Sequence, residues 1–244
     1  MSVQSSPATD KAVARALKDV AARIDSAVKR SGRTQPVRLV AVSKTKPAGA
    51  IQEAYDAGHR DFGENYVQEL LDKAPLLPGD IRWHFIGHLQ SNKARALLEG
   101  VPGLACVQTV DSAKLADRLN RIATDLQRQQ KLGVMLQVNT SGEESKYGCA
   151  PGEVVGLAQH IAGACPALQL AGLMTIGMPD YSSRPENFTC LVECRAQVAA
   201  ALGVSADSLE LSMGMSGDFE QAVEMGSTNV RVGSTIFGAR DYSK

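Results

Sequence analysis

Eight short β-rich runs alternate with helix-like segments along almost the whole chain, and this alternation limits the possible folds more than any other feature of the sequence. Runs of about four to eight β-rich residues are typical of buried strands, and strands that alternate with helices are typical of parallel sheets. The expected strands cover residues 37–43, 61–64, 82–87, 105–110, 133–139, 170–176, 208–213 and 229–233. Eight such units predict a single α/β domain, a (β/α)8 TIM barrel. A doubly wound open sheet is the alternative, although the GxGxxG turn common in such sheets does not follow the first strand.

Helical periodicity marks the segments between the expected strands. These segments are residues 48–57, 66–73, 92–99, 111–128, 151–164, 187–201 and 218–225. An extra amphipathic helix at residues 11–30 precedes the first strand, with apolar residues at spacings of three and four. No linker or low-complexity segment interrupts the alternation. We therefore expect one structural domain, in which an N-terminal helix (residues 1–35) packs on a barrel formed by residues 36–244.

Charge and cysteine content argue against several classes of function. The 26 basic and 26 acidic residues give a formal net charge of zero, so the chain has no overall field to attract nucleic acid or an anionic membrane. No apolar stretch approaches the roughly 18 residues of a membrane span, and no secretory signal is evident. The five cysteines lack CxxC spacing and suggest no disulfide framework. These features predict a cytoplasmic protein, and they permit a monomer.

A lysine stands where the first apolar run ends. Because the carboxyl ends of barrel strands share the face that carries the chemistry, we expect Lys44 to reach that face. Desolvation disfavours a charged ammonium group and lowers its pKa, so such a lysine can attack an aldehyde. The alternative is a surface lysine that extends from a strand end into solvent.

The segments after the seventh and eighth strands are rich in glycine and serine. Barrels often bind phosphate at this place, where backbone amides converge. Gly233 would let the backbone approach a phosphate closely, and Ser234 would add an amide and a hydroxyl. The segment 211–218 could complete this phosphate-binding site, although its glycines could equally serve only to make tight turns.

Six segments, in order along the chain, resemble the pyridoxal phosphate homeostasis protein family, also called the proline synthetase co-transcribed family. They are AVSKTKP (41–47), FGENY (62–66), WHFIGHLQSNK (83–93), GLM (172–174), LSMGMS (211–216) and RVG through FGAR (231–240). The resemblance runs from about residue 36 to residue 242, which is nearly the whole chain, and only the first 30 or so residues lie outside it. One departure is His88, where some relatives have proline.

The resemblance implies a fold-type III barrel, like the N-terminal domain of alanine racemase, that holds pyridoxal 5′-phosphate (PLP) as an internal aldimine. The residues of this chain that match the family's cofactor site are Lys44 for the Schiff base, Arg231 facing the pyridine nitrogen, Gly233 and Ser234 in the phosphate-binding turn, Ser212 and Ser216 as further phosphate contacts, and Asn65 and His84 lining the ring pocket. Lys46 is a weaker match for the Schiff base, because it lies two residues further on and should point the other way if the strand pleat continues.

The arginine at the pyridine nitrogen argues against broad catalysis. PLP withdraws electrons from a carbanion best when its pyridine nitrogen is protonated, and an arginine keeps its own proton. Alanine racemases tolerate such an arginine with a second base, a tyrosine presented by another subunit beside a C-terminal domain, whereas this sequence ends at Lys244. We therefore expect a PLP-binding homeostasis or carrier protein that can deliver PLP to apo-enzymes, without substantial catalysis of its own. The alternatives are a PLP enzyme such as a weak racemase, and a protein-interaction module with vestigial PLP binding.

Other reactive residues carry weaker expectations. His84 and His88 would have metal-ligand spacing only on a helix, but this segment is an expected strand and turn, so we predict no metal site. Lys146 could meet a phosphate or a second aldehyde, although a solvated loop lysine is the simpler interpretation. Cys190 and Cys194 lie four residues apart on an expected helix, where we expect buried free thiols.

Overall fold

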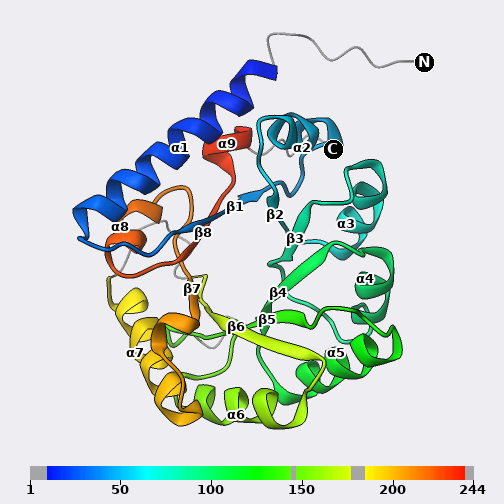
Figure 1. Cartoon of the computed structure of the whole chain (residues 1–244), viewed down its shortest axis with the longest axis vertical. Coiled ribbons are helices and arrows are strands. Elements are labelled where there is room, and N and C mark those ends of the chain that lie inside the picture. The colour runs from blue at the N-terminus through cyan, green and yellow to red at the C-terminus, as the bar shows by residue number, and fades with distance from the viewer. Residues whose placement is uncertain (1–9, 144–146, 177–184, 240–244) are drawn as a thin grey trace.

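The computed structural model of the chain describes residues 10–143, 147–176 and 185–239. Eight parallel strands follow one another around a closed barrel, and helices surround it (Figure 1). The strands are β1 Arg38–Val42, β2 Asp61–Glu64, β3 Arg82–Phe85, β4 Leu104–Val110, β5 Leu132–Gln137, β6 Leu168–Met174, β7 Glu210–Ser212 and β8 Asn229–Val232. Strand β1 pairs with both β2 and β8, which closes the barrel and excludes the open sheet. The predicted (β/α)8 barrel is confirmed.

Helices occupy the connections that the periodicity indicated. They are α1 Asp10–Arg30, α2 Ala48–Asp56, α3 Val67–Lys73, α4 Ala94–Gly100, α5 Ala113–Asp125, α6 Val154–Ala164, α7 Pro185–Leu202, α8 Phe219–Glu224 and α9 Ser234–Phe237, with 3-10 turns at Ala74–Leu76, Pro151–Glu153 and Ala206–Ser208. Ser112 caps α5, because its hydroxyl oxygen accepts the Leu115 amide at 3.4 Å. The sequence did not predict α9, since four residues are too few to show helical periodicity.

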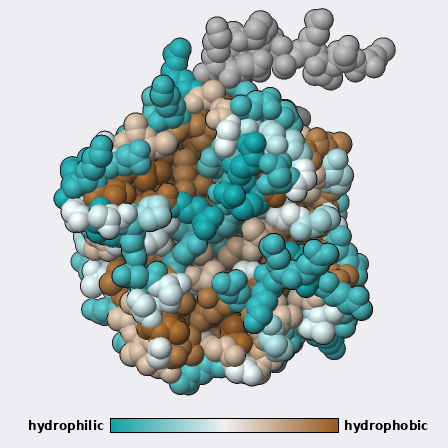
Figure 2. Space-filling view, in the orientation of Figure 1, coloured by the Kyte–Doolittle hydropathy of each residue, from teal (hydrophilic) through white to brown (hydrophobic). Residues whose placement is uncertain are grey.

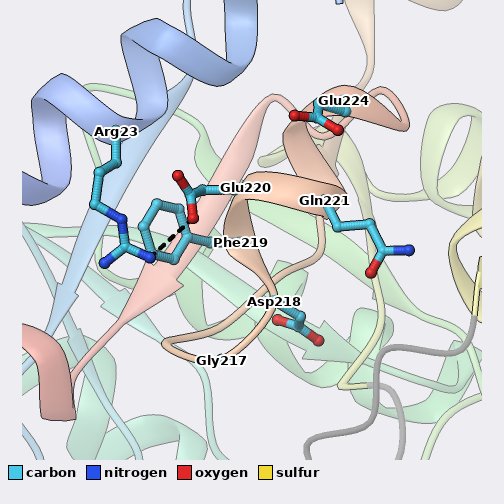
Figure 3. Close-up of a pocket in the computed structure, with 7 residues that line it drawn as sticks. All are labelled: Arg23, Gly217, Asp218, Phe219, Glu220, Gln221 and Glu224. Atoms are coloured by element: carbon cyan, nitrogen blue, oxygen red, sulfur yellow. Dashed lines mark hydrogen bonds and ion pairs between the residues drawn. The ribbon is translucent and has the colours of Figure 1, made fainter. Parts of the chain in front are cut away.

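Helix α1 packs along the outside of the barrel, against α2, α8 and α9 (Figure 1). Its buried stripe consists of Val13, Leu17, Val20, Ile24 and Ala27. Figure 3 shows the edge of this contact, where Arg23 reaches toward Glu220 across a hollow of about 260 Å³ between α1 and α8. The two side chains form an ion pair at 2.9 Å, and the Arg23 guanidinium lies 4.6 Å from the centre of the Phe219 ring. Both charges are exposed, so the buried stripe rather than the ion pair holds the helix in place.

The two faces of the strands differ in chemistry. Outward-facing residues such as Phe62, Phe85, Val230 and Val232 are fully buried and join the helices in one large apolar layer. Alternation along a strand then directs Arg231, between two of these valines, into the barrel. A barrel interior is usually filled by branched apolar side chains. Here its inward positions include a connected group of polar residues, and this group locates the candidate site.

The surface view of Figure 2 shows hydrophilic residues over much of the visible face, with apolar patches in several places among the helices. None of the described helices is both long enough and apolar enough to cross a bilayer.

Candidate functional site

Strand β1 places Lys44 at the carboxyl end of the barrel. The lysine lies in a tight turn in which the Lys46 amide donates to the Ser43 carbonyl at 3.0 Å, and it is half-buried. Gly233 directly follows the neighbouring strand β8, and its backbone lies so close to β1 that an added Cβ would be 3.1 Å from the Val42 carbonyl oxygen. Lys44 and Gly233 therefore occupy the same end of two adjacent strands. The Lys46 ammonium instead donates to the Ala239 carbonyl at 2.7 Å.

Arg231 is the charged group inside the barrel beneath this end. Its side chain is buried, and the guanidinium donates to Ser212 Oγ at 2.6 Å and to the Thr175 carbonyl at 2.8 Å. Burial lowers the pKa of Arg231 to about 10, partly offset by the Asp218 carboxylate. The guanidinium thus stays protonated at neutral pH and remains a hydrogen-bond donor.

A chain of hydrogen bonds runs from Arg231 across the barrel interior. The Ser212 hydroxyl donates to Gln108 Oε1 at 2.7 Å, and the Gln108 amide lies 3.1 Å from His84 Nδ1. His84 Nε2 lies 3.0 Å from Asp61 Oδ1. With the proton of a neutral histidine on Nε2, each group from Arg231 to His84 donates to the next, and the Asp61 carboxylate accepts the last hydrogen bond.

The Asp61 carboxylate is the anionic end of this series of hydrogen bonds. Its carboxylate also pairs with Arg38 at 3.2 Å and with Arg82. Burial raises the pKa of Asp61, but the hydrogen bonds from Arg82 and His84 and the charge of Arg38 outweigh it and hold the pKa far below its usual range. Gln108 and Asp61 were not expected from the sequence, in which each is only one polar residue beside an apolar run.

The expected phosphate-binding residues come together at the ends of β7 and β8. The Gly233 amide donates to Ser216 Oγ at 3.2 Å, and Ser234 begins α9 with an exposed side chain. Asp218 shapes the β7 loop by accepting the Met215 amide at 2.6 Å. Ser212 lies away from this turn. Its hydroxyl accepts a hydrogen bond from Arg231 and donates one to Gln108 inside the barrel. His84 belongs to the same series of hydrogen bonds, with a partner at each ring nitrogen.

Asn65 follows β2 at the same end of the barrel. Its side-chain oxygen is buried and has no hydrogen-bond partner among the described residues. Its backbone lies against Gly87, where an added Cβ would be 2.0 Å from the Asn65 carbonyl oxygen. Buried polar atoms are normally paired, so this unpaired amide oxygen at the mouth of the barrel is suited to a hydrogen-bond donor on a polar ligand.

We expect Gly87→Ala to displace Asn65, because the new methyl group would overlap the backbone. Overpacking of this kind costs about 1–3 kcal/mol of unfolding free energy, measurable by urea denaturation. Gly156→Ala in α6 is the matched control, since its Cβ would meet no atom within 4 Å and alanine favours a helix. Equal stability of the two variants would contradict the expectation.

Glu64, also at the end of β2, is completely buried on the side facing α3. Burial raises the pKa of Glu64 from 4.5 to about 7, although Lys73 and Ser43 oppose the shift. Its Oε2 atom is buried without a partner among the described residues, which costs less for a protonated carboxyl group than for a carboxylate.

The raised pKa of Glu64 predicts that stability falls with rising pH. The folded chain holds this proton more tightly than the unfolded chain, so the contribution is complete at low pH and is lost between pH 4.5 and about 7. At roughly 1.4 kcal/mol per pH unit, the loss is on the order of 3 kcal/mol. Urea unfolding across this pH range should show the decline in the native chain and not in Glu64→Gln. Parallel curves for the two proteins would refute the prediction.

The remaining reactive residues lie apart from Arg231 or outside the described residues. The rings of His88 and Tyr147 stack with centroids 3.7 Å apart, which joins the segments after β3 and β5. Lys146 lies outside the described residues. All five cysteines are free, and burial raises the pKa of Cys194 to about 12. Within the described part of the chain, one group with metal-binding atoms occurs, at Asp117, His160 and Cys165 on α5 and the end of α6.

Comparisons with known proteins identify the family to which the chain belongs. Residues 16–241 match the family model described as alanine racemase, N-terminal domain. The human pyridoxal phosphate homeostasis protein is 52% identical over 241 residues, which cover 94% of this chain and 87% of that protein.

Solved structures resemble the barrel as well, among them PipY and an alanine racemase. PipY of Synechococcus elongatus, in a structure with PLP bound, has a TM-score of 0.71 and 38% identity, covering 90% of this chain and all of that chain. Alanine racemase of Corynebacterium glutamicum has a TM-score of 0.68 over 94% of this chain and 62% of its own, and at 16% identity it shows the fold alone. The chain therefore belongs to the pyridoxal phosphate homeostasis protein family, within the larger group of proteins that share the alanine racemase N-terminal domain.

Proposed function

We propose that this chain binds PLP at the carboxyl end of its barrel and serves in PLP homeostasis. One observation carries the proposal: Lys44 and the Gly233 turn end adjacent strands, with the buried, protonated Arg231 below them. An amine, a turn of amide and hydroxyl groups, and the unpaired Asn65 side-chain oxygen fit an aldehyde that carries a phosphate and a polar ring. The PLP-bound PipY structure supports the same ligand.

Lys44 is the proposed point of covalent attachment. Its unprotonated amine adds to the aldehyde and water leaves, which forms a Schiff base without any other reactant. Hydrolysis reverses the reaction. Such a bond keeps a reactive aldehyde scarce in solution and still allows its release, as a homeostasis protein requires.

The hydrogen bonds and the charge of Arg231 favour a carrier over an enzyme. PLP supplies an electron sink that works best when its ring nitrogen is protonated. Arg231 keeps its own proton at neutral pH, and two of its N–H groups donate to Ser212 and to the Thr175 carbonyl. We infer a protein without substantial catalysis that passes PLP to apo-enzymes, acts as a monomer and resides in the cytoplasm.

The test is the near-visible absorbance spectrum of the purified protein with added PLP, before and after borohydride, followed by peptide mapping. A Schiff-base band that is trapped on Lys44 supports the proposal. Absence of the band at saturating PLP refutes it.

The competing function is a PLP enzyme such as a weak amino-acid racemase. Wash-in of solvent deuterium at the α carbon of an amino acid, at a catalytic rate, would favour the enzyme. Transfer of PLP to an apo-enzyme faster than to a solution trap would favour the carrier, and transfer at equal rates would remove direct delivery from the proposal.

A further inference from the structure

Three ionisable side chains lie in the layer between the barrel and α3, behind the turn that carries Lys44. They are Glu64 at the end of β2 and Glu69 and Lys73 on α3, and together we call them the turn clamp. The Lys73 ammonium contacts Glu64 Oε1 at 2.8 Å and Glu69 Oε2 at 3.3 Å. Glu64 and Lys73 are buried, whereas the Glu69 side chain is 29% exposed.

The clamp contacts the residues on both sides of Lys44. On one side, the Ser43 hydroxyl donates to Glu64 Oε1 at 2.7 Å, and Lys73 donates to the Ser43 carbonyl at 3.0 Å. On the other side, the Thr45 amide donates to both carboxylate oxygens of Glu69, at 3.0 and 3.1 Å. The peptide groups before and after Lys44 are therefore held by separate members of one cluster.

The held turn has an unusual backbone conformation. Thr45 has a φ of 64°, in the left-handed region that a β-branched residue rarely adopts. Such a conformation persists only where the surrounding contacts determine it, and here the Glu69 carboxylate supplies two of them. Because Thr45 directly follows Lys44, its conformation sets the direction in which the chain leaves the lysine.

Burying the clamp is costly compared with the usual apolar filling of this layer. Leucine or methionine could fill the space with equal or greater stability, because burying charges loses their solvation. The neighbouring layer is almost entirely apolar, so the cluster is an exception within it. The contacts to Ser43 and Thr45 explain why a polar cluster occupies this layer, because they specify one geometry of the turn.

We propose that Glu64, Glu69 and Lys73 are positioning residues that orient Lys44 for Schiff-base formation. The inference rests on the proposed function, since it concerns how the lysine meets its aldehyde. The clamp acts on the backbone from the face opposite the cofactor side. Its loss should therefore weaken the covalent step and leave the phosphate turn near Gly233 intact.

The test compares two ligands, PLP and pyridoxine 5′-phosphate, which has the same ring and phosphate but no aldehyde. The clamp variants are Lys73→Met, which removes the donor to Ser43 and Glu64, and Glu69→Ala, which removes the acceptor for Thr45. Because Glu69 is partly exposed, the second variant remains informative if the first fails to fold. Leu70→Ala on α3 is the control, since Leu70 is fully buried and makes no recorded hydrogen bond to the turn.

Misplacement of a reacting group can lower the rate of a reaction by up to about 100-fold. We expect the clamp variants to bind PLP about 10- to 100-fold more weakly, with less PLP trapped on Lys44 by borohydride. Affinity for pyridoxine 5′-phosphate should remain within about threefold of the native value. Glu64→Gln keeps an acceptor for Ser43 and Lys73, so it should retain the native ratio of the two affinities, whereas Glu64→Leu should not.

A readout without cofactor accompanies the binding data. Amide hydrogen exchange at Thr45 in the ligand-free protein should accelerate by about tenfold or more in Glu69→Ala and stay unchanged in Leu70→Ala. An equal loss of affinity for both ligands, or no loss for either, would overturn the inference while leaving the proposed function in place. If the native protein traps no PLP on Lys44, the proposed function fails and the inference fails with it.

Discussion

Replacing Lys44 with alanine is expected to abolish covalent PLP binding and the Schiff-base absorbance. Lys44 is the amine at the end of β1 beside the Gly233 turn, and the methyl group of alanine cannot form a C=N bond. Phosphate and ring contacts remain, so we expect weak reversible binding. The loss of affinity should be on the order of 100-fold or more, which corresponds to about 3 kcal/mol.

Equilibrium dialysis with PLP measures this loss, and mass spectrometry after borohydride shows whether any lysine is labelled. Lys46→Ala is the matched control, because its ammonium donates to the Ala239 carbonyl and it should keep the Schiff base. PLP trapped on another lysine of the Lys44→Ala variant, at native stoichiometry, would contradict the prediction.

Asp61→Asn is expected to cause the largest loss of stability. The side chain of Asp61 is 9% exposed and contacts Arg38, Arg82 and His84. Removing one partner of a buried ion pair costs about 3–5 kcal/mol, because the remaining charge stays buried. Both arginines are partly exposed, so we expect a value near the lower limit, about 3 kcal/mol.

Urea denaturation at neutral pH measures the effect, with Asp80→Asn as the control. Asp80 forms an ion pair with Arg60 at 2.9 Å but is 59% exposed, so its removal should cost less than about 1 kcal/mol. Equal losses in the two variants would show that Asp61 is no more important than a surface ion pair.

The same substitution should change the acid limb of the stability curve. The neighbouring cations lower the pKa of Asp61 in the folded chain, so its contribution is present above the unfolded pKa of about 4 and is lost as the pH falls below it. The Asn variant should therefore lose less stability between pH 4 and pH 2 than the native chain does. A parallel decline in the stability of both proteins would show that protonation of Asp61 does not contribute to acid unfolding.

The two buried acidic residues of β2 thus respond to pH in opposite directions. Asp61 faces into the barrel among cations, and its pKa is lowered, whereas Glu64 faces α3 in an apolar layer, and its pKa is raised. They are three residues apart in one strand and therefore point to opposite faces. The environment on each side of the strand, rather than the residue type, determines which form of the carboxyl group is stabilised.

The barrel could be predicted because its signals are local. Most strands are short runs rich in apolar or aromatic residues, most of the longer helices have an apolar stripe, and both patterns depend only on neighbours in sequence. Helix α9 escaped this method, because Ser234–Phe237 completes barely one turn. The end of the barrel that carries the candidate site was predictable for the same reason, since Lys44, Ser216 and Gly233 stand at or shortly after the ends of expected strands in the sequence.

The partners of the inward-facing side chains could not be predicted in this way. Ser212 resembled a phosphate contact, yet its hydroxyl bonds to Gln108, which is 104 residues away in the chain. His84 resembled a ring contact, yet its nitrogens meet Asp61 and Gln108. Only the closure of the barrel brings β2, β3, β4, β7 and β8 around one interior, where these groups can meet.

The sequence by itself was enough to predict the eight strands and the longer helices between them, and to single out Lys44 as the candidate lysine at one end of the barrel, because each depends on short-range periodicity or on a local motif. The tertiary structure decided which side chains support them. The hydrogen bonds from Arg231 to Asp61 and those of the turn clamp join residues from different strands and helices. These contacts and the pKa shifts depend on which side chains are buried together, and no local pattern specifies that.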